Sequence, residues 1–107
     1  MITLKELCEA SQVSRRAIQG YEKAHLISST GKTEKGYLLY VEDSIEEVKL
    51  IRLYQDMGFK VSEICELKTM GKEELKAKLL IKKRLLEADV QRKKSTLIEI
   101  ERMINNL

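Results

Sequence analysis

Three side chains that can recognise the edges of DNA bases lie close together near the amino terminus, namely Arg15, Arg16 and Gln19. If this segment is a helix with Ser14 as its N-cap, all three lie on the exposed side, opposite the apolar Ile18. Arginine forms paired hydrogen bonds with guanine, and glutamine does so with adenine. The spacing therefore predicts a helix surface that reads double-stranded DNA through the major groove, with Ser14 at its edge.

A second group of side chains is suited to holding the phosphate backbone, because lysine ammonium and tyrosine hydroxyl groups donate hydrogen bonds to phosphate oxygens. The candidates are Tyr21, Lys32, Lys35, Tyr40 and Lys60. For each lysine a solvated surface charge is an equally good interpretation, and Tyr37 and Tyr40 also fit the core of a hairpin. Charge alone does not decide, because residues 1–40 carry 6 basic and 4 acidic side chains.

The sequence lacks the groups that an enzyme or a metal site needs. It has one histidine, His25, two distant cysteines, Cys8 and Cys65, and five scattered glycines. No Ser-His-Asp set, carboxylate pair in a glycine-lined cleft or phosphate-binding loop can be assembled from them, so we expect no enzyme and no cofactor. Two isolated thiols do not supply the clustered donors of a metal site, and we interpret both as buried.

Length and composition restrict the class of protein further. A chain of 107 residues holds one domain and at most one appendage, and its 35% of charged residues suits much exposed helical surface. No run approaches the ~18 apolar residues of a membrane span, and acidic residues near the amino terminus argue against a signal peptide. We therefore expect a cytoplasmic protein without a membrane partner.

Caps and periodicity predict the elements that position the candidate residues. Thr3 and Glu6 form a capping box at the start of a first helix, which a tight turn at Gln12 separates from the helix running to Lys23. Residues 26–41 read as a β-hairpin with a flexible polar tip at 28–36.

Two further helices follow the hairpin. Asp43, with Glu46 completing a capping box, predicts the start of the third helix, which Gly58 ends. A fourth helix is expected over 61–70 and closes at Gly71. The buried side of the third helix is predicted to hold Ile45, Val48, Leu50, Ile51 and Tyr54.

Residues 72–107 contain neither glycine nor proline and predict one long helix. Its apolar residues follow a heptad spacing in which positions 83 and 93 are lysine, and they are Leu79, Leu86, Val90, Leu97, Ile100, Ile104 and Leu107. Folding back onto a small first domain would cover only part of this stripe. We therefore predict two domains, residues 1–71 and 72–107, and a homodimer that pairs through the second.

The whole pattern predicts a mainly α-helical protein. It consists of a winged helix-turn-helix head with a β-hairpin wing, two further helices and a long dimerisation helix. The sequence resembles the mercury-resistance-regulator (MerR) family over residues 2 to about 70. The matching positions are Val13, Ser14, Arg16, Tyr21, Glu22, Leu26, Ile27, Gly36, Tyr37, Tyr40, Gly58, Phe59, Glu63, Ile64 and Leu67. The resemblance implies a bacterial DNA-binding transcription regulator with an antiparallel helix pair. It also implies action on promoter DNA together with RNA polymerase, and a second wing near Lys60.

Departures from the family pattern affect the expected DNA contacts. The family usually has threonine, arginine and tyrosine where this chain has Ala17, Gln19 and Gly20, and an arginine at the position of Leu38. Because those family side chains contact DNA, their loss predicts lower affinity or a different operator. The leading prediction is a dimeric regulator on a palindromic site. The alternative is a protein-interaction module on the same fold that has lost DNA binding.

Overall fold

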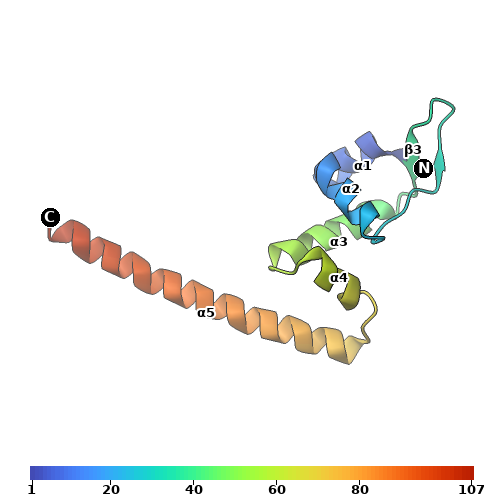
Figure 1. Cartoon of the computed structure of the whole chain (residues 1–107). Helices are drawn as coiled ribbons and strands as arrows, with labels where there is room; N and C mark the ends of the chain where they lie inside the picture. The colour runs from blue at the N-terminus through green and yellow to red at the C-terminus, as the bar shows by residue number, and fades with distance from the viewer. The chain divides into compact units, whose positions relative to one another are not determined.

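The computed structural model describes residues 1–107. Contacts divide the chain into two units, Met1–Thr69, here called the head, and Met70–Leu107, which is almost entirely one helix (Figure 1). The elements in chain order are β1 (Ile2–Thr3), α1 (Leu4–Ser11), α2 (Arg15–Lys23), β2 (Gly31–Lys32), β3 (Leu38–Tyr40), α3 (Ser44–Asp56), α4 (Val61–Leu67) and α5 (Lys72–Asn105). The mainly helical class and the winged helix-turn-helix arrangement are as predicted.

The first two helices begin where their caps predict. The Thr3 hydroxyl accepts a hydrogen bond from the Glu6 backbone N–H at 3.2 Å, and the Glu6 carboxylate accepts one from the Thr3 backbone N–H at 3.1 Å. Gln12 ends α1 in the left-handed region, at φ 59°. The Ser14 hydroxyl then accepts a hydrogen bond from the Ala17 N–H at 3.1 Å, so α2 starts at Arg15.

The hairpin forms, but it is part of a three-stranded antiparallel sheet of order β1-β3-β2. The strand β1 was not predicted, because two residues are too few to show alternation. The predicted flexible tip at 28–36 is too long, since β2 lies within these residues and pairs with β3. Only the turn at 33–36 forms the tip, closed by a hydrogen bond from the Gly36 N–H to the Thr33 carbonyl.

The hydrophobic core of the head lies where α1, α2 and β3 meet α3 and α4. Its most deeply buried large side chains are Leu7, Ile18, Tyr21, Tyr40, Val48, Ile51 and Ile64. The buried side of α3 differs from the prediction at one position, since Leu50 is 46% exposed. It lies about 200° around the helix from Val48, because each residue turns the helix by about 100°.

The ends of α3 and α4 also correct the predictions. Asp43 precedes α3 as expected, but it already has helical angles and its side chain makes no capping bond. The backbone N–H of Ser44 bonds instead to the Val41 carbonyl, in a turn that leads into the helix. Gly58, at φ 100°, follows the end of α3 as predicted, whereas α4 stops at Leu67, three residues before the expected end.

The long helix α5 spans 34 residues, about 51 Å at 1.5 Å per residue. None of its residues is buried within the single chain. Since an amphipathic helix gains most of its stability from packing, its apolar side chains need a surface that one copy of α5 does not supply. No helix of the protein is long and apolar enough to cross a membrane.

Candidate nucleic-acid interface

The exposed face of α2 carries three cations and no acidic side chain. Arg15, Arg16 and Gln19 are exposed, as predicted from their position opposite the fully buried Ile18. Lys23 lies on the same face, four residues after Gln19, and is also exposed. The sequence reasoning did not include Lys23, although the i, i+4 spacing from Gln19 was available to find it.

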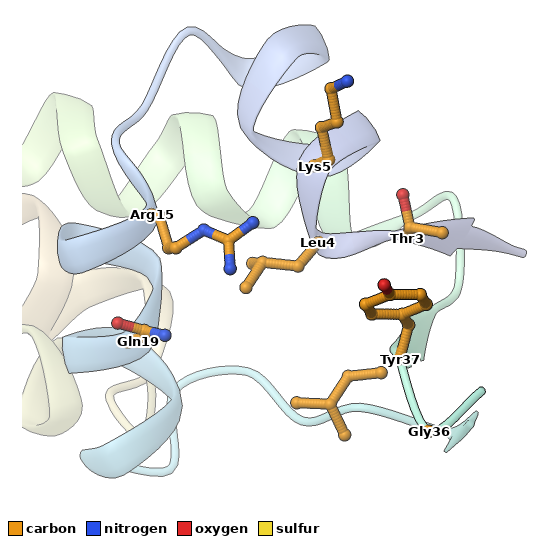
Figure 2. Close-up of a pocket in the computed structure, with 8 residues that line it drawn as sticks. Thr3, Leu4, Lys5, Arg15, Gln19, Gly36 and Tyr37 are labelled. Carbon is orange, nitrogen blue, oxygen red and sulfur yellow. The ribbon is translucent and has the colours of Figure 1, made fainter. Parts of the chain in front are cut away.

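A groove of about 530 Å³ lies between the start of α1, the first turns of α2 and the wing (Figure 2). We call it the α2–wing groove, and its lining residues are Thr3, Leu4, Lys5, Arg15, Gln19, Gly36, Tyr37 and Leu38. Figure 2 shows the Arg15 guanidinium reaching from α2 into the space towards Leu4, with Thr3 and Tyr37 on the opposite side. The groove thus brings a predicted recognition residue next to the wing.

The electrostatics of the α2–wing groove favour an anion. Its lining includes two cations, Lys5 and Arg15, and no carboxylate. The ion pairs of the chain lie within α3 and α5, so neither cation is neutralised by an acidic partner. Apolar walls beside unpaired cations suit a phosphodiester strand, whose charge attracts the cations while its sugars touch the apolar side chains. Lys5 was not predicted, because the groove joins three segments that are distant in sequence.

The wing presents further donors. Its tip is the turn at 33–36, in which Gly36 has φ 86°, a left-handed conformation that glycine adopts without strain. Lys32 precedes this turn and Lys35 lies within it, and both are exposed. Tyr37 is 63% exposed beside the groove. The structure therefore leaves both predicted wing lysines accessible and adds the Tyr37 hydroxyl, which was interpreted as hairpin core.

The prediction that Tyr21 and Tyr40 contact phosphates is wrong for this structure, because each is only 1% exposed. The Tyr21 hydroxyl donates a hydrogen bond to the Gln55 side chain, and the Tyr40 hydroxyl donates one to the Glu22 carboxylate, both at 2.5 Å. Burial, aided for Tyr40 by Glu22, raises the pKa of both phenols. These tyrosines fix α2 against α3 and against the sheet instead.

Two of the departures from the family pattern lie directly at this surface. Gly20 is exposed on α2, and a Cβ at this position would meet no atom within 4 Å. The protein's own packing therefore does not require a glycine there. Leu38 is half-buried and lines the α2–wing groove, where it adds an apolar wall in place of a positive charge.

The remaining predicted residues lie elsewhere. Lys60 is exposed at the N-terminus of α4, where its backbone N–H donates to the Glu63 carboxylate at 3.0 Å, and it does not line the groove. Cys8 and Cys65 are half-buried and form no disulfide, so the expectation that both are buried is wrong. No group of three or more His, Cys, Asp and Glu side chains is placed to hold a metal ion.

The predicted dimerisation residues form a second exposed surface, on α5. Leu79 is half-buried, and Leu86, Val90, Leu97, Ile100 and Ile104 are 43–62% exposed. Leu107 was included in the same helical stripe, but α5 ends at Asn105, so Leu107 lies beyond the helix. The stripe that the structure supports therefore ends at Ile104.

Comparison with known proteins gives one family. Residues 2–70 match the family model described as "MerR HTH family regulatory protein". The mercuric resistance operon regulatory protein of Bacillus cereus is 33% identical over 104 residues, which is 95% of this chain and 79% of that protein.

Solved structures agree with the fold. The N-terminal part of the Bacillus subtilis multidrug transporter activator, MtaN, has a TM-score of 0.75 and 28% identity, covering 97% of this chain and 98% of that one. HiNmlR is described as a MerR family regulator lacking the sensor domain, bound to promoter DNA. It has a TM-score of 0.65 and 16% identity, covering 95% of this chain and 86% of that one. At that identity, HiNmlR supports the fold alone.

Proposed function

The chain belongs to the MerR family of helix-turn-helix regulatory proteins, which are DNA-binding transcription regulators and not enzymes, and we propose that it acts as a homodimer on a palindromic promoter site. The observation that carries the proposal is the acid-free surface formed by α2 and the α2–wing groove. Arg15, Arg16, Lys23 and Lys5 give it four cations, and none has an ion-pair partner.

The contacts divide into those that read bases and those that hold the backbone. Arg16 and Gln19 project from the exposed face of α2 and are proposed to read base edges in the major groove. Arg15, which points into the α2–wing groove, is proposed to hold a phosphate there. Lys32 and Lys35 are proposed to hold the flanking backbone from the wing. In the HiNmlR structure the same fold is bound to promoter DNA.

The dimer is proposed to form through α5, whose apolar stripe is uncovered in the single chain. Two heads related by a twofold axis require two half-sites related in the same way, so the operator is an imperfect palindrome. We propose that the dimer acts on promoter DNA in the cytoplasm. RNA polymerase is its further partner, as the family resemblance implies.

The test begins with selection of bound sequences from a random DNA pool, followed by titrations on the selected operator and on a scrambled duplex. Arg16→Ala is expected to cost about 1–3 kcal/mol of binding free energy at one base position and to relax the preference there. Lys35→Ala is expected to weaken binding to both duplexes alike and to lower the salt slope by about one unit. Lys78→Ala, an exposed lysine of α5, is the matched control and should leave binding unchanged.

Two results would contradict the proposal. If the chain binds no duplex even at low salt, the substitutions at Ala17, Gly20 and Leu38 have removed DNA binding, and a protein-interaction module becomes the better conclusion. If Arg16→Ala and Lys35→Ala both behave like the Lys78 control on a duplex that does bind, DNA occupies another surface.

A further inference from the structure

The α2–wing groove has the size and the apolar walls of a site for a small organic molecule. Its volume of about 530 Å³ falls within the roughly 300–1,000 Å³ that such sites usually have. Leu4, Leu38 and Tyr37 give it apolar walls, and the protein buries Leu4 and Leu38 only in part. Because apolar surface gains free energy when it leaves water, these walls favour a ligand with an apolar body.

One charged group in the groove is placed to hold an anion. The Arg15 guanidinium reaches into the space towards Leu4 (Figure 2), and no ion pair of the chain includes it. A guanidinium binds a carboxylate through two parallel hydrogen bonds, which fix the orientation of the anion as well as its position. Gln19, one turn further along α2, adds an amide to the lining. The groove therefore combines an anion-binding group with apolar walls.

The acidic side chain in contact with the lining does not cancel this charge. Glu6 accepts hydrogen bonds from the backbone N–H and the hydroxyl of Thr3, both at 3.1 Å, and does not itself line the groove. The exposed Lys5, which follows Leu4 on α1, adds a second positive charge to the lining. With Arg15 and Lys5 present and no carboxylate, the lining is positively charged and complementary to an anion.

We propose that the α2–wing groove binds a small aromatic carboxylate, and that this ligand and DNA exclude each other. The carboxylate pairs with the Arg15 guanidinium, and the rings lie against Leu4, Leu38 and Tyr37. The exclusion rests on the proposed function, in which the same guanidinium holds a DNA phosphate. One head cannot hold both anions at once, so the ligand releases the regulator from its operator.

An aromatic body suits this groove better than a flexible alkyl chain. The ring of Tyr37 is 63% exposed, and a second ring can pack against it in an offset or edge-to-face arrangement. A rigid ring system also loses little conformational freedom on binding, whereas an alkyl chain must order each of its bonds. The probe is therefore 2-naphthoate, which carries one carboxylate on fused rings. The uncharged 2-naphthamide has the same rings and serves as its control.

The first measurement is equilibrium dialysis of the full chain against 2-naphthoate, at low salt and without DNA. A ligand of this size is expected to have a dissociation constant on the order of a millimolar or below. The Arg15→Gln variant, which removes the charge, should bind naphthoate at least tenfold more weakly, and 2-naphthamide should bind the unmodified chain equally weakly. Arg84→Gln, the same change at an exposed arginine of α5, is the matched control and should bind naphthoate normally.

Leu38→Thr tests the apolar wall separately from the charge. Threonine is favourable in a strand and leaves both cations of the groove in place, but it removes part of the apolar surface. Naphthoate should bind this variant roughly fivefold more weakly. Its affinity for DNA should not change, because the proposed contact of the groove to DNA is a charged one. Circular dichroism of each variant checks that the head still folds.

The second measurement repeats the operator titrations in the presence of 2-naphthoate. When two ligands exclude each other, the dissociation constant for one rises by one plus the ratio of the other's concentration to its own dissociation constant. Naphthoate at ten times its dissociation constant should therefore weaken the operator contact of each head about elevenfold. Sodium acetate at the same concentration, a carboxylate without rings, corrects for the added salt.

The outcomes separate the ligand site from the proposed function. If naphthoate does not bind, or binds the Arg15→Gln and Leu38→Thr variants as well as the unmodified chain, the groove is not its site and the proposal is overturned. Binding in the groove that changes operator affinity no more than acetate does overturns the exclusion. A chain that binds no duplex rejects the proposed function instead, because dialysis decides the ligand site without DNA.

Discussion

Replacing both Leu97 and Ile104 with aspartate is expected to convert the dimer into monomers. In the single chain these side chains are 60% and 62% exposed. Complete burial of a leucine or isoleucine side chain is worth about 1.5–3 kcal/mol, so covering the exposed three fifths contributes roughly 1–2 kcal/mol for each. A dimer contains four such side chains, and their loss removes roughly 4–7 kcal/mol. The aspartates add the cost of unpaired charges between the two α5 helices.

At about 1.4 kcal/mol for each factor of ten, this loss raises the dissociation constant at least a thousandfold. Light scattering coupled to gel filtration should therefore report the mass of one chain, 12.4 kDa, at concentrations where the unmodified protein has twice that mass. Circular dichroism should also lose helical signal, because an unpaired α5 has no buried residue to stabilise it.

The matched control is Ser95→Asp, which adds the same carboxylate at an exposed position outside the predicted dimerisation residues of α5. This variant should remain a dimer. If the double variant also stays dimeric at tens of micromolar, where micromolar affinity would already favour the pair, the reasoning from exposed apolar area is refuted and α5 does not pair through Leu97 and Ile104.

Four further predictions concern the head. Gly20→Ala is expected to raise the free energy of unfolding by about 1 kcal/mol, measured by urea denaturation, because alanine favours the helix and meets no neighbouring atom. The raised pKa of Tyr40 means that the folded state disfavours the ionised phenol. The contribution of Tyr40 to stability should therefore be constant below about pH 10, the ordinary tyrosine value, and should decrease as the pH rises past it. Denaturation curves of Tyr40→Phe should show a shallower fall. Leu38→Arg is expected to tighten binding to operator and scrambled duplex alike, since the new guanidinium would lie in the groove near phosphate. Replacing Cys8 and Cys65 with serine should leave operator affinity insensitive to zinc, and a zinc response that disappears in this variant would show a metal site that the structure does not contain.

The helix boundaries that could be predicted are those set by local hydrogen bonds. Thr3 and Ser14 form the caps that their residue types predict, and Gly58 ends α3 in the conformation that glycine favours. Asp43 failed as a cap because a preceding turn at 41–44 already satisfies the first backbone donors of α3. The side-chain pattern does not reveal such a turn.

The site residues that could be predicted are likewise those whose positions depend on local structure. Arg15, Arg16 and Gln19 were predictable because one helix with one buried face fixes which side chains are exposed. Tyr21 and Tyr40 were assigned wrongly because a tyrosine fits a core as well as a surface, and Gln55 and Glu22, which accept their hydrogen bonds, lie far away in sequence. For the same reason no local pattern indicated that Lys5 lines a groove with the wing.

The two proposed surfaces depend on each other. The chain has Ala17, Gly20 and Leu38 where the family usually has polar or charged side chains, so under the proposed function we expect one head alone to bind DNA weakly. Joining two heads through α5 makes the second binding event intramolecular, and the affinities of the two heads then combine. It follows that breaking the α5 pair should reduce operator affinity more than removing any single lysine of the wing.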